Sequence, residues 1–97
     1  GAAGATGLGE AIIKICGSHA IVELMRNGES PEQACKIAIQ RIKNSNKDLK
    51  DIQVGFIAMN KKGEIGSYSL YSGFNYAYQD IQRFKLIDSQ YDFDWED

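Results

Sequence analysis

The chain begins with a run of small residues that ends in a glycine-rich turn. From Gly1 to Thr6 no side chain is larger than that of threonine, and an apolar run with helical spacing starts at Leu8. Small side chains suit a strand whose backbone must approach another part of the protein closely. The stretch Gly4–Glu10 therefore predicts a strand-to-helix turn at Thr6-Gly7, with backbone N–H groups free to hold an anion or a polarised carbonyl oxygen.

The glycine spacing by itself has low specificity. It does not match the G-x-G-x-x-G pattern of dinucleotide sites, and no G-K-[ST] follows as in a P-loop. Close packing between a strand and a helix also explains these glycines, and the spacing alone favours that explanation.

Composition restricts the class of protein. Ninety-seven residues suit one small domain or a piece of a larger one, and 43% hydrophobic with 25% charged residues is typical of globular proteins. The net charge of −2 provides no basic surface for nucleic acid. No apolar run reaches the roughly 18 residues that span a bilayer, and no signal peptide is recognisable. We therefore expect neither nucleic acid nor a membrane as a partner.

Two helices are predicted after the turn. Apolar residues at helical spacing indicate one helix from Leu8 to Asn27, which Gly28 ends. The sequence Ser30-Pro31-Glu32-Gln33 is typical of a second helix start, because serine can cap and proline suits the first helical position. This helix has a narrow apolar face that extends to Ile42, so we expect a hairpin of two helices.

Three residues in these helices have chemistry that could serve a site. His19, the only histidine, shares a predicted helix face with Ile15 and Val22, so we expect it to be packed rather than catalytic. No cluster at ligand spacing predicts a metal, and we expect no cofactor. Cys16 and Cys35 would lie about 10 Å apart along a helix pair. Because a disulfide needs Cα atoms within about 7 Å, we expect two buried free thiols.

The second half of the chain predicts strands. Ile52 to Met59 is apolar on both faces, which indicates a central strand in a covered sheet. Asn60-Lys61-Lys62-Gly63 is typical of a hairpin turn. The expected order then continues with an antiparallel return over Glu64 to Leu70, a third strand over Phe74 to Tyr78, an edge segment over Ile81 to Ile87, and an acidic tail over Asp88 to Asp97 that is mobile or packed against a partner chain.

The predicted fold class is α+β: a strand, a helix hairpin and an antiparallel meander. This order places one helical layer beside one sheet and leaves the other face of the sheet uncovered, although its strands are apolar on both faces. We therefore expect that further polypeptide completes the protein.

Four stretches resemble the C-terminal part of the mature β-subunit of glycosylasparaginase (aspartylglucosaminidase), an N-terminal-nucleophile hydrolase. They are GAAGATGLGE, GSHAIVELMRNGESPEQACKIAIQRI, LKDIQVGFIAMNKKGEIGSYS and GFNYAYQD. The resemblance assigns residues 1–80 to the catalytic fold and leaves 81–97 as an edge segment and tail. The threonine-glycine turn is also shared with plant-type asparaginases and isoaspartyl peptidases.

The resemblance implies an αββα sandwich that hydrolyses the amide bond between an asparagine side chain and N-acetylglucosamine. The nucleophile in that family is a threonine at the N-terminus of the β-subunit, exposed by self-cleavage, whose α-amino group acts as base. Thr6 matches the threonine whose hydroxyl forms one side of the oxyanion hole. Gly7 matches the glycine whose N–H forms the other side and whose carbonyl helps to bind the substrate's α-amino group.

The resemblance also implies partners and a location. The α-subunit and the rest of the β-subunit would complete the enzyme, as a dimer of αβ units in a periplasmic or lysosomal-type compartment. Thr6 is the only threonine and it is internal. The family's nucleophile, and the arginine and aspartate that hold the substrate, have no counterparts here, so the chain alone is expected to be inactive.

Two other functions are compatible with the sequence. One keeps the superfamily but changes the substrate to free asparagine or β-aspartyl peptides. The other is a non-catalytic module whose glycine-rich helix start binds a phosphate or another anion.

Overall fold

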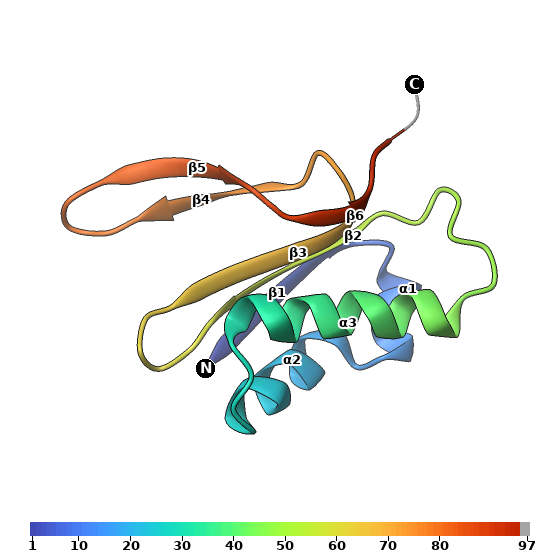
Figure 1. Ribbon diagram of the computed structural model, residues 1–97, viewed down its shortest axis with the longest axis horizontal. Helices are drawn as coiled ribbons and strands as arrows, with labels where there is room; N and C mark the ends of the chain where they lie inside the picture. The colour runs from blue at the N-terminus through green and yellow to red at the C-terminus, as the bar shows by residue number, and fades with distance from the viewer. Residues whose placement is uncertain (96–97) are drawn as a thin grey trace.

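The computed structural model describes residues 1–95 and has the α+β composition predicted from the sequence. Three helices cover one face of a four-stranded sheet, and a two-stranded hairpin lies on the other side (Figure 1). The elements are β1 (Ala2–Gly7), α1 (Gly9–Lys14), α2 (Gly17–Arg26), α3 (Pro31–Ser45), β2 (Val54–Met59), β3 (Ile65–Tyr71), β4 (Asn75–Gln79), β5 (Phe84–Asp88) and β6 (Tyr91–Phe93).

The main sheet has the strand order β1-β2-β3-β6. β2 is antiparallel to both of its neighbours, which confirms the central strand predicted from its two apolar faces. The register places Thr6 opposite Gly55, and Gly55 opposite Ser69. The turn at 60–63 also forms as predicted, with Gly63 at φ 82°.

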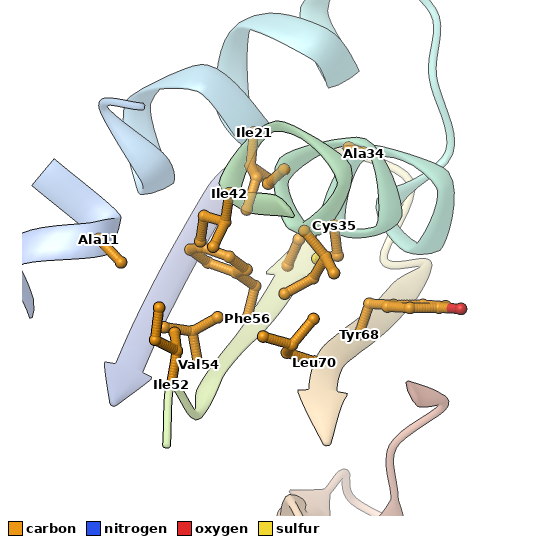
Figure 2. Packing of buried hydrophobic residues seen from close by; sticks show 13 residues of the cluster. Ala11, Ile21, Ala34, Cys35, Ile42, Ile52, Val54, Phe56, Tyr68 and Leu70 are labelled. Atoms are coloured by element: carbon orange, nitrogen blue, oxygen red, sulfur yellow. The ribbon is translucent and has the colours of Figure 1, made fainter. Parts of the chain in front are cut away.

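The core lies between the sheet and the helices. Phe56, Val54 and Leu70 point from the sheet toward Ile21, Cys35 and Ile42 on the helices (Figure 2). Ser30 caps α3 as predicted, because its Oγ accepts the Gln33 N–H at 3.2 Å. These contacts bury one continuous apolar layer, which is the main source of stability for a chain of this size.

The single helix predicted for Leu8 to Asn27 is wrong, because the structure breaks it into α1 and α2. Cys16 adopts a left-handed conformation at φ 53°, and α2 begins at Gly17. A Cβ on Gly17 would lie 2.7 Å from Ile12 Cγ2 and 2.9 Å from the Phe56 ring. The break lets each short helix direct its own apolar residues to the core, Ala11 from α1 and Ile21 from α2.

The break also overturns two predictions of burial. His19 and Cys16 are exposed, because the change of direction at Cys16 alters which residues of the following helix face the sheet. Only Cys35 is a buried free thiol. Burial, and then the negative charge of Glu32, raise the pKa of Cys35 to about 12.

The third strand of the predicted meander does not pair with the second. β4 instead pairs with β5, and the two form a hairpin that projects from the body of the molecule (Figure 1). Gly73, at φ 99°, turns the chain out of the sheet, and the Phe74 ring then covers Gly55, where a Cβ would come within 2.8 Å of it. The predicted edge segment is therefore a strand of this hairpin.

The acidic tail is also partly a strand, which corrects the prediction for its first half. β6 pairs with β3 in parallel. Asp92 holds it in place, because its carboxylate accepts the Tyr68 hydroxyl at 2.8 Å and lies 3.1 Å from Lys43 Nζ on α3. Residues 96 and 97 of that predicted tail lie outside the described residues.

The sheet face opposite the helices, which we call the open face, is only partly covered: Ser67 and Ser69 on β3 are buried, whereas the end of β2 is not. Ile57 and Met59 on β2 are 39% and 46% exposed. The hairpin leans over this face through Tyr76 and Tyr78 and forms the wall of an open pocket of about 370 Å³, which Gly4 and the two β2 side chains also line. Within residues 1–95, no helix is long and apolar enough to cross a membrane.

Candidate active site

The predicted strand-to-helix turn forms at Thr6-Gly7. β1 ends at Gly7, Leu8 is the extended residue before α1, and the helix begins at Gly9. Gly7 has a φ of 115°. The small residues before it place β1 directly against β2, with Ala5 opposite Phe56 and Gly7 opposite Val54.

Position 7 accepts only glycine in this geometry. A Cβ there would collide with the Gln53 carbonyl oxygen and lie 2.8 Å from Val54 Cα. Its φ is also in a region that other L-residues rarely adopt. The glycine therefore serves a close backbone approach at the end of the strand, in addition to any role in binding.

The register turns the Gly7 N–H away from β2. Leu8 N–H donates to Gln53 O at 3.0 Å, which makes this pair a hydrogen-bonded one. Hydrogen-bonded and non-hydrogen-bonded pairs alternate along an antiparallel ladder, so Thr6 bonds with Gly55 and the Gly7–Val54 pair is not hydrogen-bonded. Beyond the other end of β2, the Asn60 N–H donates to Glu64 O at 3.1 Å, in line with the β2–β3 pairing. Even-numbered residues of β2 therefore bond with β3 and odd-numbered ones with β1, which agrees with this assignment.

Gly7 therefore presents its N–H at an outer edge of the sheet. β1 has no strand on its other side among residues 1–95. The N–H of Leu8, in contrast, is occupied by Gln53, so the prediction that the helix start leaves its N–H groups free does not hold for this residue. Of these two amides, that of Gly7 is the one that β2 leaves free.

Thr6 belongs to the open face. Thr6 lies directly opposite Gly55, and residues that are opposite each other in the ladder share a face of the sheet. Alternate residues of a strand also share a face, so the side chains of Thr6, Ile57 and Met59 project on the same side. Thr6 is exposed. Its hydroxyl and the Gly7 amide are thus consecutive groups at one corner of the sheet, where a second chain segment or a substrate can reach both.

The other titratable candidates lie elsewhere. His19 is on α2, in the helical layer that covers the opposite face of the sheet. Within the described residues, no group of three or more His, Cys, Asp or Glu side chains is placed to hold a metal ion. The turn therefore offers hydrogen-bond donors and small side chains, a combination suited to stabilising a developing negative charge on oxygen.

Sequence reasoning did not identify Gln53 as part of this corner. Its carbonyl accepts the Leu8 N–H, and its side chain binds both backbone groups of Tyr71 on β3. A glutamine directly before an apolar strand has no distinctive pattern, because its partners are 18 residues away in the sequence.

Residues 1–86 match the model of a protein family described as asparaginase, and the chain belongs to that family of amidohydrolases. The resemblance to glycosylasparaginase predicted from the sequence is thereby confirmed.

Two curated relatives are named as N(4)-(beta-N-acetylglucosaminyl)-L-asparaginases. An N(4)-(beta-N-acetylglucosaminyl)-L-asparaginase of Elizabethkingia miricola is 56% identical over 84 residues, which is 82% of this chain and 25% of that protein. A Drosophila grimshawi protein with a provisional name for the same activity is 42% identical over 64 residues, 66% of this chain and 16% of its own length. The chain thus spans a quarter or less of the relatives that it matches.

Proposed function

We propose that this chain is the C-terminal part of the β-subunit of an amidohydrolase that cleaves N4-(β-N-acetylglucosaminyl)-L-asparagine, and that it supplies the oxyanion hole. The Gly7 N–H and the Thr6 hydroxyl are the two donors. The observation that carries the proposal is the register of β1, which leaves the Gly7 amide unused by β2 in a chain of the asparaginase family.

In this proposal the nucleophile is an N-terminal threonine contributed by absent polypeptide. Its hydroxyl oxygen attacks the side-chain amide carbon of the substrate, and its own α-amino group takes the hydroxyl proton. The carbonyl oxygen becomes an oxyanion that the two donors hold. Collapse breaks the C–N bond, the protonated amino group returns the proton to the leaving glycosylamine, and water hydrolyses the resulting acyl-enzyme. Each donor is worth about 3 kcal/mol in comparable enzymes.

The proposal extends to the assembly. A second sheet from the α-subunit and the rest of the β-subunit would cover the open face, completing the αββα sandwich. Ile57 and Met59 support this, because adjacent exposed apolar side chains of this size often mark a contact surface. By family resemblance the enzyme is a dimer of αβ units in a periplasmic or lysosomal-type compartment.

The test is Thr6→Ala in the complete protein. Loss of one oxyanion donor lowers kcat by roughly 10²- to 10³-fold. The melting temperature should change much less than kcat, which distinguishes a loss of catalysis from a loss of folding. Thr6→Ser keeps the hydroxyl and is the matched control, with activity close to the wild type. Full turnover by Thr6→Ala would remove the assignment.

A second substrate class has its own support, since the matching family is described only as asparaginase. Free asparagine and a β-aspartyl dipeptide would then be preferred over glycosylated asparagine. Parallel measurements of kcat/KM on the three substrates decide between the two activities.

A further inference from the structure

We infer that Gln53 is the positioning residue of the oxyanion hole: it fixes the Thr6-Gly7 turn to the sheet from the side opposite the substrate. This inference rests on the proposed function, because it concerns the placement of the donors named there. Nothing in the sequence pattern or the family comparison assigns a role to Gln53.

The main chain of Gln53 touches the turn at two points. Its carbonyl oxygen accepts the Leu8 N–H at 3.0 Å. The same oxygen is the atom with which a side chain at position 7 would collide, so the Gly7 backbone lies directly against it. A shift of the Gln53 carbonyl therefore moves Gly7 and the Gly7–Leu8 peptide, and with them the adjoining Thr6–Gly7 peptide that carries the proposed donor.

The side chain of Gln53 determines where that carbonyl lies. Its Oε1 accepts the Tyr71 N–H at 3.0 Å, and its Nε2 donates to Tyr71 O at 3.0 Å and more weakly to Ser72 O at 3.5 Å. The side-chain amide thus forms with Tyr71 the pair of bonds that a neighbouring strand residue would form. It fastens the start of β2 to the end of β3, one residue before the strand begins.

Tyr71 is itself held in place, which makes the attachment rigid. Its hydroxyl donates to Leu49 O at 2.9 Å, and its ring stacks on Trp95 at 4.2 Å between centroids. The path from β3 to the turn is consequently a continuous set of bonds: Tyr71, the Gln53 side chain, the Gln53 carbonyl and the Leu8 amide. Positional errors of about 1 Å at reacting groups lower rates by about 10²-fold.

Asn60 provides a matched control, because it has a similar arrangement at the other end of β2. Its Oδ1 accepts the N–H groups of Lys62 and Glu64 at 3.0 Å, and its Nδ2 donates to Glu64 Oε1 at 2.8 Å. It lies seven residues after Gln53, roughly 23 Å along an extended strand. Asn60 therefore fastens the same strand without contacting the turn.

The experiment compares Gln53→Leu and Asn60→Leu in the complete enzyme. Both variants lose side-chain hydrogen bonds, and we expect both to lower the melting temperature. Only Gln53→Leu should lower kcat, by tenfold or more, with KM changed less than threefold, because the donors that it misplaces act on the transition state. Turnover is expressed per mole of self-cleaved enzyme, measured by intact mass, so that a defect in maturation is not counted as a defect in catalysis.

Two results overturn the inference: a normal kcat for Gln53→Leu, or an equal loss of kcat in Asn60→Leu. Thr6→Ala in the same assay separates this failure from failure of the proposed function. If Thr6→Ala loses activity and Gln53→Leu does not, the oxyanion hole stands and the positioning role fails. If Thr6→Ala is fully active, the proposed function fails.

Discussion

At the scale of single residues, the two residues of the turn meet different requirements: Gly7 serves the backbone geometry, and Thr6 contributes a side chain. Gly7 is required by space, since its neighbours Gln53 and Val54 leave no room for a Cβ. Thr6 has no such constraint, because it is exposed on the open face. Packing within this chain thus places no requirement on the Thr6 side chain, and the hydroxyl is the group that we propose to act.

The two cysteines should differ in reactivity, because Cys16 is exposed and Cys35 is buried. We expect alkylation at pH 8 to label Cys16 rapidly and to leave Cys35 unlabelled, because Cys35 is buried and its pKa is raised to about 12, which keeps it a thiol. Mass mapping of the labelled peptides in the folded protein measures this, and labelling in denaturant is the control. Rapid labelling of Cys35 in the folded protein would contradict its placement in the core.

At the scale of elements, β6 depends on one polar cluster. Tyr68, Asp92 and Lys43 join β3, β6 and α3. Burial, followed by the hydrogen bond and charge of Asp92, raises the pKa of Tyr68 from 10.0 to about 12. The neutral phenol is therefore favoured in the folded state more than in the unfolded state. Its contribution to stability is complete below pH 10 and is lost as the pH rises toward 12.

Tyr68→Phe tests this contribution. We expect the variant to be less stable than the wild type at pH 8 by about 1.5–3 kcal/mol, the usual value of a hydrogen bond to a charged group. The difference between the two proteins should shrink between pH 10 and 12, where the phenol ionises in the unfolded chain but stays neutral in the folded one. Urea unfolding at each pH measures it. A difference that is constant up to pH 12 would show that folding does not raise the pKa of this phenol.

At the scale of the whole molecule, the chain has a complete core on one side of its sheet and an incomplete surface on the other. Phe56 on β2 and Leu70 on β3 are fully buried under the helices. Ile57 and Met59, on the opposite face of β2, are partly exposed. The hairpin β4–β5 covers only part of this face. The second sheet that we propose would cover the rest of this face.

Two properties of the isolated chain follow. Residues 1–97 alone should not hydrolyse glycosylated asparagine, because the proposed nucleophile is elsewhere, and they should bind an apolar dye through the open face. Ile57→Ser with Met59→Ser should reduce dye fluorescence, while Ile13→Ser, an exposed helix position, is the control. Turnover by the isolated chain would contradict the proposed origin of the nucleophile.

The local pattern was sufficient to predict several elements. The helix start at Ser30, the turn before Gly63 and the turn at Thr6-Gly7 depend on capping, glycine conformation and side-chain size, which are properties of adjacent residues. Fold class and family also follow from such patterns, because they are repeated along the chain in a recognisable order.

Long-range contacts decided the rest. The break at Cys16 depends on the Phe56 ring 40 residues later in the sequence, and the pairing of β6 depends on Tyr68 and Lys43, so neither has a local signal. The role inferred for Gln53 likewise exists only once β3 lies beside β2. Sequence alone therefore determined which groups the turn carries, and only the tertiary structure decided which of them is free and what holds it, because hydrogen-bond partners across a sheet are chosen by register.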